Sequence, residues 1–322
     1  MNFRVKTDKA LNICILVLLS VGVYTISVFL LSAYVGGDQV HYREFYSEAA
    51  STALSQLIFL GEVHLGASEP ISLFLLWLGA NIGIEKIIYI SSLNVILVCS
   101  LYLLARKYRA SWIVIFLLLT NFYVLVLLTG AERLKFAYIF VVLSILIGGR
   151  LGLMLGVLSS LAHFQNFILL VGALFGSLSQ ALKSLVFRLY LSKYLAWIFV
   201  LSIIFPVFVF VNFGDAISGK LVVYSSRQKS YYDLLQICLF SVAAIFVSRD
   251  RFRMFLSLLP MLPAVLLLGG SRVNMIAFTI VVFFLLLERR LSHPTFLVLL
   301  SYFSLKSVFF VVNIIIYGNG FA

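Results

Sequence analysis

The chain has 322 residues, of which 63% are hydrophobic and only 11% charged, and its mean hydropathy is +1.12. These values exclude a soluble globular domain and indicate a polytopic integral membrane protein. The net charge of +12 does not indicate nucleic-acid binding, because the lysines and arginines lie in small clusters between apolar runs, where they set the orientation of the chain in the membrane. The three cysteines lie in apolar runs without paired spacing, so neither a disulfide framework, a metal site nor a cofactor is predicted.

Apolar runs of about 20 residues, enough to cross about 30 Å of hydrocarbon as a helix, recur along the chain. We predict an all-α fold, a single transmembrane domain over residues 1–322, with larger outer loops near 36–69 and 214–233. It would be a helix bundle of about 11 spans (10–12) that places the N-terminus in the cytoplasm and the C-terminus outside.

The first run, Leu11–Tyr34, is longer than a signal-peptide core and lacks a clean cleavage site, so we expect an uncleaved first span. Basic residues precede it, which places the acidic loop 36–69 outside. The next apolar piece, residues 71–84, would make about 21 Å of helix, too short for a comfortable span. It predicts a re-entrant or interfacial helix.

The remaining spans are predicted over 87–105, 112–129 and 136–149, then on both sides of His163, and then near 194–213, 234–248, 254–268, 273–287 and 295–316. Residues 151–182 hold 32 positions without Asp, Glu, Lys or Arg, which as one helix would measure about 48 Å. Two helices that meet at "HFQN" fit the membrane better. A break there also keeps eight later lysines and arginines in the cytoplasm.

The break makes His163 a candidate functional residue, since an ionisable side chain at membrane depth is a functional hypothesis by default. Gln165 and Asn166 beside it can satisfy freed backbone groups or bind a ligand. The alternative is a polar break that only permits the turn.

Further candidates flank other spans on the predicted outer side. Asp38 follows the first span after a Gly-Gly turn. A glycosyl or phosphate transfer outside the membrane would need a base to take the proton of the acceptor hydroxyl, and Asp38 and His163 are the two candidates. Arg133 and Arg272 go against the cytoplasmic bias of basic residues, and a guanidinium fork matches phosphate oxygens, so both are candidate diphosphate ligands. For both arginines the alternative is snorkelling to headgroups or pairing with Glu132 or Glu62.

The chain also holds arginines and aromatic residues to which we assign no such role. Arg43 and Arg227 are better explained by headgroup contact or pairing. Tyr42 and other tyrosines of the outer loops can stack on sugar rings, but an aromatic belt at the membrane interface explains them equally well.

Five segments in order resemble the EpsG-like branch of Wzy-type polysaccharide polymerases: "GGDQVHYREFY", "EPISLFLLWLG", "ERLKFAYIFVVLSIL", "LGVLSSLAHFQNFILLVGAL" and "GSRVNMIAF". The family's motifs match Asp38 with Tyr42, Glu69, Arg133 with Ala137, His163 and Arg272. Leu134 stands where the family has Gln, and Phe164 follows His163 where Ser is usual.

The resemblance implies a metal- and nucleotide-sugar-independent glycosyltransferase of the bacterial inner membrane. It would polymerise undecaprenyl-diphosphate-linked oligosaccharide repeat units at the outer face, into O-antigen, capsule or exopolysaccharide. Tyr42 and Glu69 would bind substrate. Gln165 and Asn166 are further substrate-binding candidates because of their place at the helix break, apart from the family motifs. A chain-length regulator and a flippase would be partners in the pathway.

Three other functions stay open. One is a purely structural membrane subunit, which unchanged polymer in normally expressed point variants of the outer loops would support. A polyprenyl-phosphate-sugar-dependent glycosyltransferase would use an acidic base in the first outer loop, which Asp38 fits, although Gln39 stands where an acidic partner is usual. A lipid-linked oligosaccharide flippase would show charges through the depth of the bundle and a repeat between its halves, and the sequence shows neither.

Overall fold

The computed structural model describes residues 2–188, 231–268 and 270–321, with a few isolated positions between them. These residues fold as helices and connecting turns, and no strand occurs among them, which confirms the all-α prediction. They group into two compact units. The first, here called the N-terminal unit, is Met1–Phe164 with Leu300–Ala322; the second, the central unit, is Gln165–Leu299.

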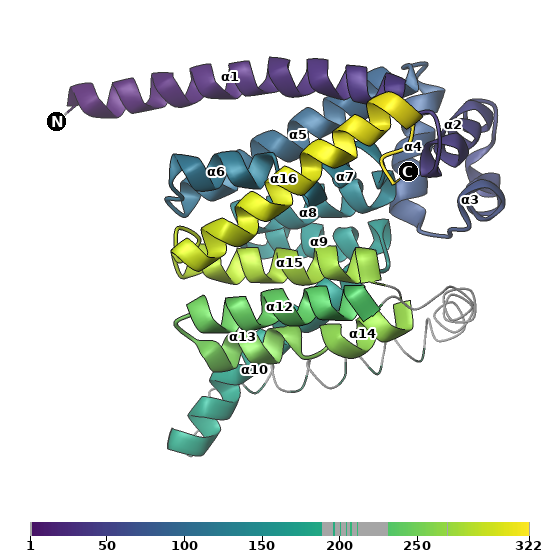
Figure 1. The fold of residues 1–322 in the computed structure, drawn as a ribbon. Coiled ribbons are helices and arrows are strands. Elements are labelled where there is room, and N and C mark those ends of the chain that lie inside the picture. The colour runs from purple at the N-terminus through teal and green to yellow at the C-terminus, as the bar shows by residue number, and fades with distance from the viewer. Residues whose placement is uncertain are drawn as a thin grey trace. The chain divides into compact units, whose positions relative to one another are not determined.

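The N-terminal unit begins with a long apolar helix and continues through shorter ones. Its elements are α1 (Asn2–Ala33), α2 (Asp38–Ala49), η1 (Leu54–Gln56), α3 (Leu57–Leu65), α4 (Pro70–Asn81), α5 (Lys86–Lys107), α6 (Trp112–Leu119), α7 (Phe122–Thr129), α8 (Glu132–Ile147) and α9 (Gly149–Ala162). The part of α16 (Pro294–Tyr317) from Leu300 onward also belongs to this unit. Helix α1 packs along α5, and α5 packs on α8 (Figure 1).

The central unit holds α10 (Asn166–Arg188), α12 (Tyr231–Val247), α13 (Arg251–Leu258), α14 (Met261–Leu268), α15 (Gly270–Leu287) and the start of α16. Within it α10 packs against α13, and α12 against α15. The predicted span at 194–213 and nearly all of the predicted outer loop near 214–233 lie outside the described residues.

Four described helices are long and apolar enough to cross a membrane, namely Ala10–Ala33, Lys86–Lys107, Asn166–Phe187 and Pro294–Tyr317. The number rises to six if each of two bent pairs is one span, α3 with α4 and α6 with α7. By length and composition, the described part of the chain thus holds several candidate membrane spans, which is typical of a membrane protein. The larger predicted count of about 11 also includes shorter helices and residues outside the described part.

The segment predicted as a short non-spanning helix is α4, whose 12 residues measure about 18 Å. It is bent by 100° from α3, so the pair forms either a broken span or a re-entrant loop. Gly66 ends α3 at φ 54°, a left-handed conformation that glycine adopts without steric penalty.

The predicted helix break at His163 is confirmed. Helix α9 ends at Ala162 and α10 begins at Asn166, and His163 between them has the extended angles φ −154° and ψ 117°. The backbone N–H of His163 still donates to Ser159 O at 3.1 Å, which closes the last turn of α9.

The order and packing of the helices in the N-terminal unit bring His163, at the end of α9, close to residues from earlier helices. Helices α8 and α9 are joined at Gly148 and pack against each other, so the end of α9 returns to the start of α8. Helix α4 packs on both, and α2 packs on α4. The starts of α2, α4 and α8 and the end of α9 therefore lie close together.

Candidate active site

Four side chains from separate elements of the N-terminal unit meet at this place. Tyr42 lies on α2, Glu69 is the residue before α4, Arg133 lies in the first turn of α8, and His163 follows α9. All four are buried, with exposed fractions of 5%, 0%, 9% and 3%. Buried ionisable groups are stable only when they are paired, so their partners define the site.

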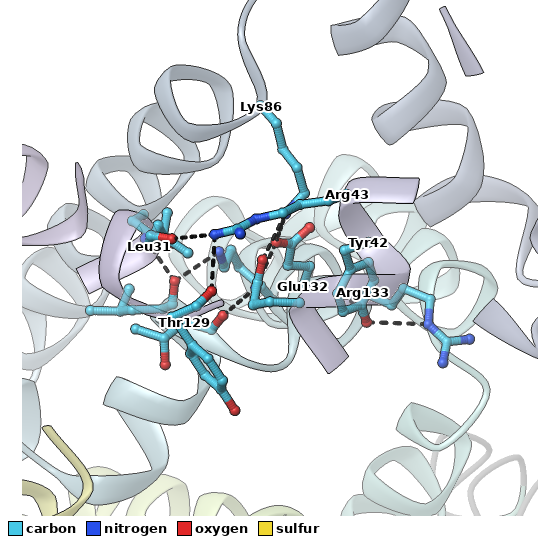
Figure 2. Close-up of polar contacts among 12 residues, drawn as sticks. Leu31, Tyr42, Arg43, Lys86, Thr129, Glu132 and Arg133 are labelled. Carbon is cyan, nitrogen blue, oxygen red and sulfur yellow. Dashed lines mark hydrogen bonds and ion pairs between the residues drawn. The ribbon is translucent and has the colours of Figure 1, made fainter. Parts of the chain in front are cut away.

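Glu69 is the centre of this cluster because its two oxygens hold different partners. Oε2 accepts a hydrogen bond from Nη1 of Arg133, and Oε1 lies 3.1 Å from Nδ1 of His163. Nε of Arg133 is 3.4 Å from the Tyr42 hydroxyl oxygen and donates to it (Figure 2). Nη2 of Arg133 makes no hydrogen bond within the described part of the chain, and the arginine side chain is 11% exposed.

Local sequence explains why Glu69 stands where it does. Pro70 is the first residue of α4, where its fixed φ suits a helix start and its missing N–H is not needed. A residue before proline avoids the helical region, and Glu69 accordingly has φ −73° and ψ 107°. Its side chain is thus carried outside the helix, next to α8 and α9.

A second buried network adjoins the first. Oε1 of Glu132 accepts from Nζ of Lys86 at 2.7 Å and from Nε2 of Gln39 at 2.9 Å, and Lys86 also donates to Gln39 Oε1 at 2.7 Å. Nζ of Lys86 lies 5.7 Å from the centre of the Tyr42 ring, so the two networks meet at this tyrosine. Glu132 and Arg133 are consecutive but point to different networks (Figure 2).

The charged groups of the two networks pair one to one. Glu69 contacts Arg133, and Glu132 contacts Lys86. Lys135 nearby is fully buried with its Nζ 3.1 Å from Leu128 O, and burial lowers the pKa of its ammonium to about 7, so it does not add a full positive charge at neutral pH. A histidine beside the Glu69–Arg133 pair can accept a proton.

Tyr42 contributes a neutral group to this site. Burial raises the pKa of its hydroxyl, and the charge of Glu132 acts in the same direction while that of Arg133 opposes it. The phenol therefore stays protonated at neutral pH and serves as a hydrogen-bond acceptor for the arginine.

The predicted site residues divide into those that meet and those that do not. Tyr42, Glu69, Arg133 and His163 meet; the partner of Arg133 is Glu69 and neither Glu132 nor Glu62. Asp38, the first residue of α2, is exposed, and its charge reaches Tyr42 at a distance.

Three predicted residues belong to the central unit. Gln165 is partly buried, and Asn166 is fully buried with neither amide atom hydrogen-bonded within the described part of the chain. Arg272 lies in the first turn of α15, and its side chain is outside the described part.

The arginines to which no ligand role was assigned behave differently. Arg43 donates from Nη2 to Leu31 O, in the last turn of α1, at 2.9 Å and to Tyr34 O, just after the helix, at 3.0 Å (Figure 2). Arg227 lies outside the described residues.

Sequence reasoning missed the second network. Gln39, Lys86 and the carboxylate role of Glu132 were not singled out, although Lys86 is an isolated cation at the start of an apolar helix, a position that needs a partner. Among the described residues no group of three or more His, Cys, Asp and Glu side chains is arranged to hold a metal ion.

Comparison of the chain with protein-family models, with characterised proteins and with solved structures gives no match.

Proposed function

We propose that this protein is a membrane glycosyltransferase that polymerises undecaprenyl-diphosphate-linked oligosaccharide repeat units at the outer face of the bacterial inner membrane. One observation supports the proposal above the others. Tyr42, Glu69, Arg133 and His163 come from four separate motifs of the family resemblance and are up to 121 positions apart, yet they form one buried contact network.

In the proposed reaction a growing chain on its lipid diphosphate is the donor, and a hydroxyl of an incoming lipid-linked unit is the acceptor. His163 takes the proton of the acceptor hydroxyl through Nε2, and the acceptor oxygen forms a bond to the anomeric carbon of the donor sugar. The bond from that carbon to the phosphate oxygen breaks, and the lipid diphosphate leaves with the electron pair. The histidine then releases its proton to water or to the leaving phosphate.

Arg133 is the proposed ligand of the leaving diphosphate, where negative charge develops in the transition state. Its Nη2 group is available for this contact, and the planar guanidinium matches the spacing of phosphate oxygens. Arg272 is proposed as the second arginine of the diphosphate site, and Asp38 as the alternative base. Gln165 and Asn166 are proposed to bind sugar hydroxyls; for Asn166 the support is that its buried amide has no hydrogen-bond partner within the described part of the chain.

The reaction requires a site that opens to the outer face. We propose about 11 crossings, a cytoplasmic N-terminus and an outward break at His163, because this arrangement keeps most lysines and arginines in the cytoplasm. Helix α4 would then be a re-entrant element that brings Glu69 to the site from the outer side.

The test is the surface glycan of a deletion strain complemented with variants. Without the protein, single repeat units should replace long chains, and the unchanged gene should restore the ladder. His163→Asn, which keeps hydrogen bonding but is a poor proton acceptor, should fail to restore it at normal protein level. A deletion strain with a normal ladder refutes the polymerase function.

A further inference from the structure

Five arginines lie in two turns of the central unit and take no part in the proposed chemistry. Arg249, Arg251 and Arg253 lie at the turn from α12 into α13, and Arg289 and Arg290 lie just after α15. We propose that these two turns form a binding site for the headgroup of an anionic phospholipid, with Arg253 and Arg290 as its phosphate ligands. The inference is independent of the proposed glycosyl transfer.

Hydrogen bonds and a ring contact join the two turns. The carboxylate of Glu288, the residue after α15, accepts from the hydroxyl of Ser248 at 2.9 and 3.0 Å and from the backbone N–H of Arg249 at 2.7 Å. One helical turn before Glu288, the ring of Phe284 lies 4.4 Å from the guanidinium carbon of Arg253. Both turns therefore present their basic residues at the same end of the central unit.

The two carboxylates of these turns bind other groups and do not pair with the arginine side chains. Glu288 is bonded as described, and Asp250 accepts from Nζ of Lys183 on α10 at 2.7 Å and from the backbone N–H of Arg253 at 3.1 Å. None of the five arginines forms an ion pair within the described part of the chain. With Lys183 there are six cations and two carboxylates, and the excess of four positive charges attracts an anionic partner.

Two of the arginines each hold a buried nitrogen that the fold does not satisfy. Nε of Arg253 and Nε of Arg290 are buried and make no hydrogen bond within the described part of the chain, and the same is true of Nδ1 of His293. Buried polar atoms are almost always hydrogen-bonded, so three such atoms in adjoining turns indicate a bound partner. Both arginine side chains are partly exposed, so their guanidinium groups can be reached from outside the bundle.

The chemistry of these groups favours a phosphate that belongs to a lipid. A guanidinium donates two parallel N–H groups that match the oxygens of a phosphate. Phe252 and Phe255 of the same short helix are 42% and 45% exposed, so apolar surface lies beside the arginines. A soluble phosphate leaves that surface exposed, whereas the acyl chains of a lipid cover it. In the proposed topology both turns are cytoplasmic, on the side where anionic lipids attract basic segments.

The basic cluster at the end of α5 differs from this one, because its side chains already have partners in the fold. Lys107 donates to Ile145 O at 2.9 Å and to Leu146 O at 3.0 Å, and the guanidinium carbon of Arg106 lies 4.7 Å from the centre of the Trp112 ring. In the described part of the chain neither side chain holds a buried nitrogen without a hydrogen bond. Arg106 therefore provides a matched control, with the same loss of charge and no expected lipid contact.

The experiment is native mass spectrometry of the purified full chain, released from micelles that contain equal amounts of phosphatidylglycerol and phosphatidylcholine with the same acyl chains. The unchanged protein should retain phosphatidylglycerol in preference to phosphatidylcholine. Arg253→Met and Arg290→Met should each lower that preference about fivefold, the effect expected of one basic residue near an anionic headgroup. Arg253→Lys keeps the charge without the fork and should lower it less. Arg106→Met should leave it unchanged.

Three results would overturn the inference. The first is equal retention of the two lipids by the unchanged protein, a comparison that needs no variant and so remains decisive if Arg253→Met or Arg290→Met fails to fold. The second is an equal loss of preference in Arg106→Met and Arg253→Met, which would show diffuse attraction to basic residues. The third is full displacement of phosphatidylglycerol by millimolar inorganic phosphate, which would assign the site to a soluble ligand. None of these measurements involves polymer, so the proposed function is tested separately.

Discussion

The ion pair between Glu69 and Arg133 gives a quantitative prediction that is independent of any enzymatic activity. The two charged groups are buried and in direct contact. Unit charges about 4 Å apart attract each other by about 4 kcal/mol at an effective dielectric constant of about 20. Removal of one partner from a buried pair costs about 3–5 kcal/mol, because the other charge is left uncompensated. Glu69→Ala and Arg133→Met should each lower the free energy of unfolding by that amount.

The double variant should be less destabilised than the sum of the single variants, because it leaves no unpaired guanidinium behind. We expect a coupling energy of about 2–3 kcal/mol. The assay is denaturant unfolding in mixed micelles, followed by tryptophan fluorescence, with Trp77 of α4 as a reporter near the site. Glu69→Ala combined with Arg43→Met is the control pair and should be additive. Additivity of Glu69 and Arg133 within about 0.5 kcal/mol would refute a direct buried pair.

Three further predictions concern other parts of the account. Arg133→Ala and Arg272→Ala should abolish or shorten the polymer at normal protein level, and lysine at either position should restore it in part. Arg227→Ala should have little effect. Equal loss of polymer in all three alanine variants would contradict a diphosphate site. Burial raises the pKa of Tyr34 to about 12, so the absorbance difference between the unchanged protein and Tyr34→Phe should show a phenol that ionises near that pH, and a midpoint near the ordinary value of about 10 would contradict its buried position. Cysteine placed at Ser192 should resist an impermeant reagent added outside, and strong labelling would show that the chain does not return at His163.

Some of this architecture was predictable because it follows from local composition. The break at His163 was predictable because 32 positions without Asp, Glu, Lys or Arg are too long for one span and the polar residues cluster at one point. The role of Arg43 was not predicted: we expected headgroup contact or pairing with a carboxylate, whereas its Nη2 donates to the carbonyls of Leu31 and Tyr34 at the end of α1.

The contacts inside the site were not predictable from local composition. Glu69 lies 64 positions before Arg133 and 94 before His163, and only the packing of α4 against α8 and α9 brings them together. Arg133 follows Glu132 in the sequence, but consecutive residues on a helix point in different directions. The two side chains therefore do not pair: Arg133 contacts Glu69, and Glu132 contacts Lys86. Lys86 was recognisable from the sequence as an isolated cation at the start of an apolar helix. Its partners were not, because Gln39 lies on α2 and Glu132 on α8.

The most direct test of the account is polymerisation by the purified protein in liposomes that contain the lipid-linked repeat unit isolated from the deletion strain. The account predicts that the unchanged protein alone, without nucleotide sugar or added metal, converts single units into a ladder of longer lipid-linked chains. It further predicts that His163→Asn, folded and inserted at the same level, forms no ladder. A ladder of normal length from His163→Asn would contradict the central claim that this buried histidine takes the proton of the acceptor.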